Sequence, residues 1–403
     1  MSQRNPERSA SQLPRKGKCG RENHNFNSLR AAQLATQATH HLAEQIPHDP
    51  TRRSRVQRAL LHTLFAYQDV MPVNFYESFL KYLTTQPLNT VFVDPQNRDA
   101  VRRHLPTRTE VLDNFPVITT TIPEDKAGTS RVRAVIADIT QRGGIAFRQS
   151  SASALPSWMI ERQMLEGSLA VGDTVKIVDL CGAPGNKTLN LLFLPGVVDT
   201  TAVINDRSST RLQRLETRLQ ELFFEGSGNG EYTRRFPDGR NARIYLTNFD
   251  ATDPTAVDQT VDRCLKGKSP NIVIADVECP GDGRLQVHPS FGTRYLYRSV
   301  EETLSQQRIL QNASDVVAYA GSGLVVYSTC SVSPIVNEAV VEAVVVGSKN
   351  LGFVDIYVDD RVVFRPVFEY KGIRLDSSIR GARTFPGNAM QEGFFCSLIE
   401  KAS

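Results

Sequence analysis

The chain has 403 residues, of which 40% are hydrophobic, enough for one large domain or two moderate ones. It has no stretch of the roughly 18 to 20 apolar residues that cross a bilayer, and its first residues lack the apolar core of a signal peptide. We therefore expect a soluble intracellular protein with no membrane partner. The six scattered cysteines form no C-x-x-C pair, which argues against a disulfide framework and predicts no metal site.

The net charge of +4 is spread unevenly along the chain. Residues 1–60 carry eleven Lys and Arg against four acidic residues, so the remainder is slightly acidic. A basic arm suits a polyanionic partner such as RNA, although a solvated tail or an organelle-targeting segment has the same composition. We expect a nuclear or cytoplasmic protein, with the mitochondrion as the alternative.

Taken in chain order, residues 1–53 have the polar composition of a disordered basic tail. Residues 54–139 are predicted to form a small α+β module that contributes to RNA recognition. Its apolar spacing over 54–83 predicts two short helices broken near Pro72, followed by a strand at Thr90–Val93. Nearby cations would add sequence-independent phosphate affinity: Arg52, Arg53, Arg55, Arg58, Arg102 and Arg103.

Residues 140–403 alternate between short β-rich runs and helical runs, which predicts a doubly wound, mainly parallel sheet. A Gly-rich insertion is expected over 226–240. One helix is expected to begin at Lys187, a second to end near Phe224, and a third to span Ser299–Tyr319. The expected strands are Val175–Leu180, Thr201–Ile204, Arg243–Leu246, Asn271–Ala275 and Gly323–Tyr327, then the adjacent C-terminal strands Phe353–Val358, Val362–Phe368 and Gly393–Ile399, with a turn at Asp359–Asp360.

The segment V-D-L-C-G-A-P-G-N-K-T at 178–188 runs from a strand through a turn of small residues into a helix. Gly182 and Gly185 allow close approach of the backbone to a ligand, and the helix N-terminus favours an anionic group. The segment matches neither G-x-x-x-x-G-K-[ST] nor G-x-G-x-x-G. This disfavours mononucleotide and dinucleotide cofactors, and with them a nicotinamide-dependent oxidoreductase.

Three acidic residues stand at the C-terminal ends of successive expected strands: Asp179, Asp206 and Asp250. Each one alone reads more readily as a turn residue or a helix cap. Together they converge on the crevice where such sheets bind ligands, and an acid at the position of Asp206 commonly binds ribose hydroxyls. They indicate a cofactor that contains a nucleoside.

Two cysteines also stand at strand ends, Cys279 in I-A-D-V-E-C-P-G-D-G and Cys330 in V-V-Y-S-T-C-S-V-S-P. Cys330 precedes a helix expected to begin near Pro334. A thiolate is stabilised near a helix N-terminus or a cation, whereas a buried thiol is inert. From these residues alone, burial in the core remains the alternative for each cysteine.

These motifs resemble, in order, those of the Nop2/Sun-domain family of RNA cytosine-C5 methyltransferases, and are most similar to its eukaryotic tRNA-methylating branch. The similarity covers about residues 140–400. It includes N-D-R-S-S-T-R, T-N-F-D-A and both cysteine motifs, with G-G-I-A-F-R-Q-S-S-A-S-A-L-P upstream and R-T-F-P-G-N-A-M-Q-E-G-F-F downstream. The implied fold is α/β, a Rossmann-like S-adenosylmethionine-dependent methyltransferase sheet, mainly parallel with antiparallel C-terminal strands.

The resemblance implies an enzyme that transfers a methyl group from S-adenosyl-L-methionine to carbon 5 of cytosine in RNA, with tRNA favoured and rRNA as the other candidate. Cys330 would be the nucleophile, Cys279 would assist elimination, Asp276 would bind the ring near N3, and Lys187 would contact the base or a thiol. The implied cofactor-binding residues are Cys181, Gly182, Ala183, Pro184, Gly185, Lys187, Asp206, Arg211, Asp250 and Asp276.

The sequence departs from the family pattern next to one cysteine. In the usual D-x-P-C-S motif, Glu278 replaces the proline and Pro280 the serine. We expect Glu278 to raise the pKa of a nearby thiol. Phe249 and Gly387 stand where histidine is common. The alternative function is therefore a catalytically weak or inactive RNA-binding or ribosome-assembly factor that keeps the fold.

Candidate RNA contacts outside the cysteine motifs are Arg148, Arg294, Tyr295 and Arg298. The last three follow the Cys279 motif, where Phe291 and Tyr297 also lie. A mixture of cations and aromatic rings suits single-stranded RNA, whereas packing of the rings into the core explains them equally well. We expect the protein to act as a monomer.

Overall fold

The computed structural model describes residues 88–107, 117–123, 125–284, 299–319, 321–356, 364–370, 372–385 and 392–402. The expected tail and the two helices over 54–83 lie outside these residues, as does the turn at Asp359–Asp360. So do Arg294, Tyr295 and Arg298. Within the described residues, no helix is both long enough and apolar enough to span a bilayer.

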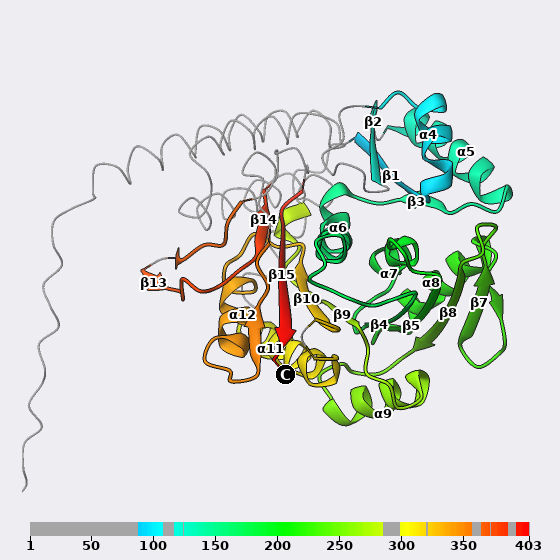
Figure 1. Ribbon diagram of the computed structural model, residues 1–403. Coiled ribbons are helices and arrows are strands. Elements are labelled where there is room, and N and C mark those ends of the chain that lie inside the picture. Colours follow the sequence, from blue (N-terminus) through cyan, green and yellow to red (C-terminus); the bar gives the residue numbers. More distant parts are fainter. Residues whose placement is uncertain are drawn as a thin grey trace, which may run out of the picture.

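A small α+β unit precedes the large sheet (Figure 1). Its three strands pair in the order β2-β1-β3, all antiparallel. Strand β3 lies beyond the expected module boundary at 139. It belongs to the small sheet because its Arg148 pairs with Val91 of β1. The elements are β1 Leu88–Val93, α4 Arg98–His104, β2 Val117–Pro123, α5 Lys126–Gln141 and β3 Ala146–Arg148.

Ten strands form the main sheet, with nine in the order β11-β15-β10-β9-β4-β5-β8-β7-β6 and β14 paired with β15. The central strands β10, β9, β4, β5 and β8 are parallel, as expected for a doubly wound sheet. The strands are β4 Thr174–Asp179, β5 Asp199–Asn205, β6 Glu225–Gly226, β7 Glu231–Arg235, β8 Asn241–Thr247, β9 Ile272–Asp276, β10 Leu324–Thr329, β11 Leu351–Phe353, β14 Ala382–Thr384 and β15 Phe394–Lys401.

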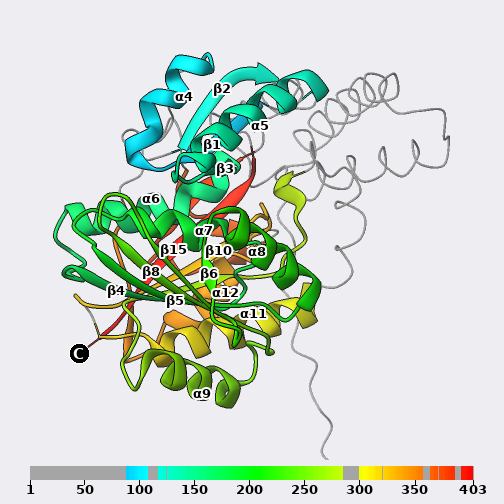
Figure 2. The ribbon, with the colours of Figure 1, turned by 90° about the vertical axis from the view of Figure 1, so that its right-hand side faces the viewer.

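Helices cover both faces of this sheet, with α6, α7 and α8 on one side and α9, α11 and α12 on the other (Figures 1 and 2). Adjacent strand residues point to opposite faces, so Ile177 packs in the first core and Val178 in the second. The helices are α6 Ser151–Leu165, α7 Asn186–Asn190, α8 Ser209–Glu221, α9 Pro254–Leu265, α11 Ser299–Val316 and α12 Glu338–Val345.

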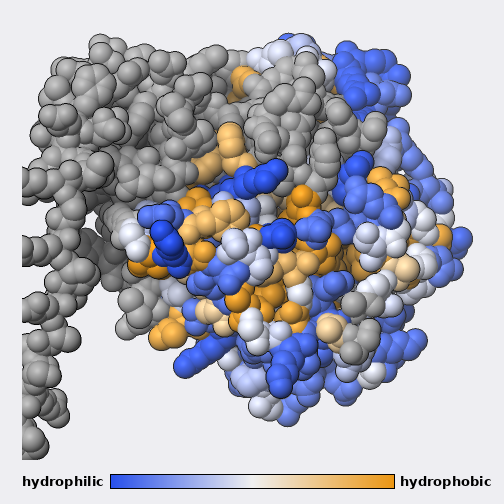
Figure 3. All heavy atoms as spheres, turned by 60° about the vertical axis from the view of Figure 1, so that its left-hand side comes forward, coloured by the Kyte–Doolittle hydropathy of each residue, from blue (hydrophilic) through white to orange (hydrophobic). Residues whose placement is uncertain are grey.

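Helix starts follow local capping. Ser208 accepts a hydrogen bond from the backbone of Arg211 to begin α8, and Asp253 caps α9 in the same way, with Pro254 at the first helical position. Hydrophobic side chains reach the surface in the middle of one face of the molecule and hydrophilic ones surround them (Figure 3).

The expected insertion over 226–240 contains a strand that the sequence did not indicate, β7, which pairs with β8 and extends the sheet. Two sequence expectations about these elements were wrong. The helix expected near Pro334 begins at Glu338, because hydrogen-bonded turns precede it. At the C-terminal end, β11 stops at Phe353, and residues 365–368 of the expected strand Val362–Phe368 form no strand. Of the three expected C-terminal strands, only Gly393–Ile399 is largely matched in the described residues, by β15.

A buried ion pair links α12 to β14. Arg383 and Glu338 are 1% and 0% exposed, and a guanidinium nitrogen of Arg383 donates to Glu338 over 2.9 Å. Arg383 also donates to the carbonyl of Val332, two residues after Cys330. The pair therefore fixes the loop after β10.

We expect Arg383→Met to lower the free energy of unfolding by about 3 to 5 kcal/mol, because the Glu338 carboxylate is then buried without its partner. Urea denaturation measures the change. Arg380→Met is the matched control. Arg380 pairs with the exposed Asp355, so that loss should stay at about 1 kcal/mol or less. Equal losses in the two variants would contradict the role of the buried pair.

Candidate functional site

Close packing around the turn after β4 requires glycine at two of its positions. A Cβ at Gly182 would lie 2.5 Å from a side-chain carbon of Ile204, and one at Gly185 would lie 2.5 Å from Leu215. Gly185 also has φ +91°, which side chains rarely adopt. The turn is therefore held against β5 and α8. The helix that follows, α7, has only five residues.

Asp179 ends β4 with its carboxyl group buried. Thr188 donates to its Oδ2 over 2.7 Å. Its Oδ1 has no hydrogen-bond partner among the described residues. Burial raises the pKa of Asp179 to about 7. An unpartnered buried oxygen of this kind suits a ligand that brings a hydrogen-bond donor.

A cavity of about 290 Å³ lies beside this turn. Four of the expected cofactor residues line it: Cys181, Asp206, Arg211 and Asp250. Asp206 is 2% exposed, and its Oδ2 lies 2.9 Å from a guanidinium nitrogen of Arg211. Its Oδ1 accepts from the backbone of Ser208, so it also shapes the start of α8. The turn-residue and ligand-binding interpretations of Asp206 are therefore compatible.

The remaining wall of the cavity comes from α11. Glu302, Ser305, Gln306 and Ile309 contribute to it. The buried Oε1 of Gln306 has no hydrogen-bond partner among the described residues, whereas its Nε2 donates to the carbonyl of Glu278 over 2.8 Å. Sequence reasoning missed these residues, because only the packing of α11 brings them to the strand ends.

The thiols of Cys279 and Cys330 lie side by side, with 3.3 Å between their sulfur atoms. The hydrogen bond with Cys330, burial and the negative charge of Asp282 raise the pKa of Cys279. Cys279 therefore keeps its proton and can donate to the sulfur of Cys330. Burial likewise raises the pKa of Cys181 and of Cys396, which suits inert thiols.

Asp276 lies at the end of β9, next to the cysteine loops. Lys187 Nζ lies 2.6 Å from its Oδ2 and also donates to Ser153 over 3.3 Å. Ser328 donates to Oδ1 over 2.7 Å. Lys187 is 9% exposed, so this cation is fixed beside the carboxylate. Sequence reasoning did not select Ser328 or Ser153.

Hydrogen bonds join the two cysteine loops directly. Gly283 N donates to Cys330 O over 3.1 Å, and Gly393 N donates to Gly283 O over 2.8 Å. Asp282 accepts from the backbone of Val332. The Gly-Asp-Gly segment after Cys279 therefore connects β9, β10 and β15.

Glu278 has an ionic partner that the sequence alone does not indicate. Its carboxylate pairs with the guanidinium of Arg207, and both residues line the cavity. The hydrogen bond with Cys330 and burial raise the pKa of the Cys279 thiol most, and the negative charge of Asp282 adds to them. Glu278 points toward Arg207, which offsets its charge.

The expected site residues divide into groups. Gly182, Ala183, Pro184 and Gly185 form the turn behind the cavity, where Ala183 O accepts from Arg211. Lys187 and Asp276 lie with the cysteine pair. Arg148 ends β3 in the small sheet. In the described part of the chain, no cluster of three or more His, Cys, Asp or Glu side chains could hold a metal ion.

We expect Asp179→Asn to reduce the pH dependence of stability. The folded-state pKa of about 7 exceeds the ordinary value of 3.8, so between these values the folded protein binds the extra proton. The contribution of Asp179 to stability therefore falls as the pH rises from 3.8 to about 7, and is constant above. Melting temperatures across this range measure it. Asp258→Asn, at an exposed position of α9, should leave the parent profile unchanged.

We expect Glu278→Gln to leave the pH midpoint for alkylation of Cys279 unchanged, because Glu278 is paired with Arg207. Asp282→Asn should shift that midpoint to lower pH, since it removes a negative charge near the thiol. Iodoacetamide rates, followed by mass spectrometry of the peptide that contains Cys279, measure both. A lower midpoint in the Glu278 variant would contradict the pairing.

Solved structures support the fold. A methyltransferase homologue from Pyrococcus horikoshii superposes with a TM-score of 0.60 at 17% identity, covering 88% of this chain and 100% of that one. A second structure, of NSun6 from the same organism with SFG, gives a TM-score of 0.56 at 15% identity, covering 85% and 98%. At these identities the likeness concerns the Rossmann-like architecture alone.

Curated relatives match about half of the chain. The 5-cytosine rRNA methyltransferase nsun-4 of Caenorhabditis elegans is 32% identical over 208 residues, which cover 49% of this chain and 39% of that protein. The tRNA (cytosine(34)-C(5))-methyltransferase of Drosophila melanogaster is 26% identical over 219 residues, covering 51% and 25%. The chain thus spans half or less of the length of these relatives. Residues 167–400 match the family described as 16S rRNA methyltransferase RsmB/F, and the chain belongs to this family.

Proposed function

We propose that this protein methylates carbon 5 of cytosine in RNA, using S-adenosylmethionine as the methyl donor and Cys330 as the nucleophile. The observation that carries the proposal is the sulfur pair. Cys279 and Cys330 lie 3.3 Å apart beside the Lys187–Asp276 pair. The names of the relatives, which act on rRNA or tRNA, support the same reaction.

The cavity residues fit the cofactor. The unpartnered Oε1 of Gln306 in the cavity wall can accept from its amino or hydroxyl groups, and Asp206 stands where a ribose is commonly bound. Hydrogen bonding to Thr252 lowers the pKa of the exposed Asp250, which keeps its carboxylate ionised as an acceptor. When bound, S-adenosylmethionine supplies the sulfonium methyl group that becomes attached to carbon 5.

The two thiols have different roles in the proposed reaction. The sulfur of Cys330 adds to carbon 6 of cytosine, which makes carbon 5 nucleophilic. A proton on Cys279, held by its raised pKa, stabilises negative charge on the neighbouring sulfur. After methylation a general base takes the proton from carbon 5, the electrons of that bond form the double bond between carbons 5 and 6, the bond between sulfur and carbon 6 breaks, and Cys330 leaves as a thiolate. Cys279 assists this elimination by donating a hydrogen bond to the departing sulfur.

Asp276 and Lys187 act on the ring. The Asp276 carboxylate is partly exposed at 27%, so it can accept from the base near N3 while Lys187 and Ser328 hold it in place. Protonation or polarisation of N3 at this position offsets the negative charge that thiolate addition creates on the ring. The target cytosine must leave any base stack, which favours loops and single strands.

The RNA target that we favour is tRNA, with rRNA as the alternative. The Gly-Asp-Gly segment that follows Cys279 after Pro280 resembles the tRNA-methylating branch. We also propose that the small α+β unit contributes to RNA binding, since Arg102 and Arg103 are exposed on α4. The expected sites of action remain the nucleus or cytoplasm, and otherwise the mitochondrion.

The decisive experiment incubates Cys279→Ala with cytosine-containing RNA and S-adenosylmethionine. We expect a covalent protein–RNA complex on a denaturing gel, because elimination is slowed while addition is intact. The double variant Cys279→Ala/Cys330→Ala should form none.

The parent protein is the control for turnover and should transfer tritiated methyl groups to cellular RNA. Cofactor binding without methyl transfer and without an adduct would contradict the proposal. That result would favour a catalytically inactive RNA-binding or ribosome-assembly factor.

A further inference from the structure

A second and larger hollow, of about 1090 Å³, lies across the opposite end of the central strands. We call it the strand-start groove, because Thr174, Asp199 and Asn241, at the first positions of β4, β5 and β8, line it. The cofactor cavity lies at the other end of the same strands. Strand β4 has six residues, so the two sites are separated by roughly 17 to 20 Å along the strand.

The floor of the groove continues the face of the sheet that α9 covers. Val178 and Val203 are buried in the core under α9. Two residues earlier on each strand, and therefore on the same face, stand Lys176 and Thr201, which are half-buried. Register places Lys176, Thr201 and Arg243 on one rung of the sheet. The face thus changes from apolar to polar at the end of the helix.

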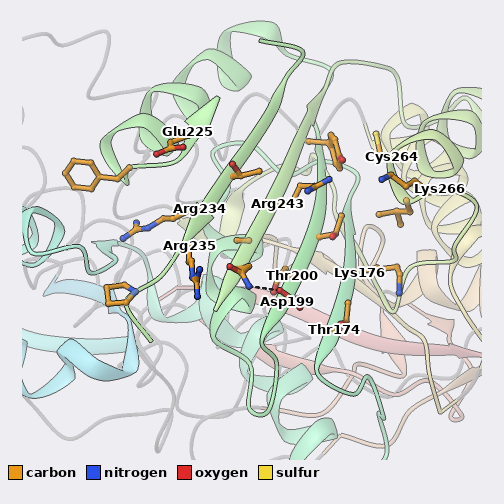
Figure 4. A pocket seen from close by; sticks show the side chains of 18 of the residues that line it. Thr174, Lys176, Asp199, Thr200, Glu225, Arg234, Arg235, Arg243, Cys264 and Lys266 are labelled. Carbon is orange, nitrogen blue, oxygen red and sulfur yellow. Dashed lines mark hydrogen bonds between the residues drawn. The ribbon is translucent and has the colours of Figure 1, made fainter. Parts of the chain in front are cut away.

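Cations surround the groove from several elements. Figure 4 shows Lys176 and Arg235 on their strands and Lys266 at the end of α9. Lys268 also lines the groove. Within the described residues, no hydrogen bond or ion pair occupies the charged groups of these four side chains, and the last three are exposed.

The acidic residues of the groove do little to offset these charges. Two acids line the groove, Asp199, which accepts from Asn241 over 2.9 Å, and Glu225, so they offset only part of the charge of the lining lysines and arginines. Arg243 already pairs with Glu231 at 3.4 Å. The groove therefore presents a surplus of positive charge over a floor of hydroxyl and amide groups.

Such a surface suits a phosphate backbone. Lysine and arginine neutralise phosphates without reading sequence, and threonine and asparagine side chains add hydrogen bonds to phosphate oxygens. The groove also includes Phe223, whose side chain is 56% exposed. An exposed ring beside cations is a stacking surface for an unpaired base.

We propose that the strand-start groove binds the sugar-phosphate backbone of the RNA at a distance from the target cytosine. This inference rests on the proposed function for the identity of the polyanion. Because the groove lies at the far end of β4, it contributes to RNA affinity and not to the chemical step. Loss of its cations raises KM and leaves kcat unchanged.

The test replaces three groove cations together, as Lys176→Gln/Arg235→Gln/Lys266→Gln. Binding of an oligocytidine RNA of about 30 nucleotides is measured over a range of salt concentrations. We expect roughly tenfold weaker binding at moderate salt, and a slope of log K against log salt that is smaller by about 2, since each lost single-strand phosphate contact removes about 0.7.

The matched control removes the same charge elsewhere, as Arg308→Gln/Lys349→Gln/Arg374→Gln, three exposed positions outside the groove. It should bind RNA like the parent. Equal binding by the two triple variants would overturn the inference. So would displacement of the RNA by polyglutamate at equal charge concentration, which would indicate an acidic protein segment as the partner.

A second measurement needs no substitution. Bound RNA should protect Lys176, Lys266 and Lys268 from acetylation, while Lys349 stays reactive. Lack of protection would also overturn the inference. If the parent binds RNA through the groove but transfers no methyl group, the proposed function fails and the groove assignment stands. If the parent is active and the groove variant binds normally, only the groove assignment fails.

Discussion

The pairing register of β9 with β10 is the constraint on which the site depends. It places Asp276 opposite Ser328 in adjacent parallel strands. The segments that follow the two strands then turn over the same edge of the sheet, and the sulfur atoms of Cys279 and Cys330 lie 3.3 Å apart. A Cβ at Gly283 would lie 2.8 Å from the carbonyl oxygen of Cys330 and 2.1 Å from that of Gly393, so the loop after β9 packs against both segments with no space for a side chain. The distance between the thiols is therefore a consequence of backbone packing.

Buried polar groups maintain the loop that carries Cys330. Thr329 bonds to Asn337, which in turn donates to Ser331 O. The backbone of Val332 is held on both sides, its N–H by Asp282 and its carbonyl by Arg383. The first two contacts are local, whereas Asp282 and Arg383 come from distant parts of the chain, and a half-satisfied network would cost stability. The position of Cys330 therefore depends on contacts from β14 and from the loop after β9.

The parts of the fold that the sequence predicts well are local. Strands such as β4 and β9 are short apolar runs bounded by turn residues, and motif order predicts both cysteines and Asp276 as site residues. The parts it misses depend on distant contacts. Strand β7 reads as a Gly-rich insertion because its pairing with β8 is not encoded by its own apolar residues. Gln306 carries no local signal either, since only the packing of α11 turns it toward the cavity.

Glu278 illustrates how a departure from a motif is interpreted differently once its surroundings are known. In the sequence it replaces a proline and places a charge next to a thiol. In the structure its carboxylate pairs with Arg207, and its carbonyl accepts from Gln306 over 2.8 Å. The loop before Cys279 is thus held by two contacts instead of a rigid ring. Both contacting side chains line the cofactor cavity. The loop before Cys279 is therefore connected to the walls of the cavity; a proline at this position would keep the carbonyl contact with Gln306 but lose the ion pair with Arg207.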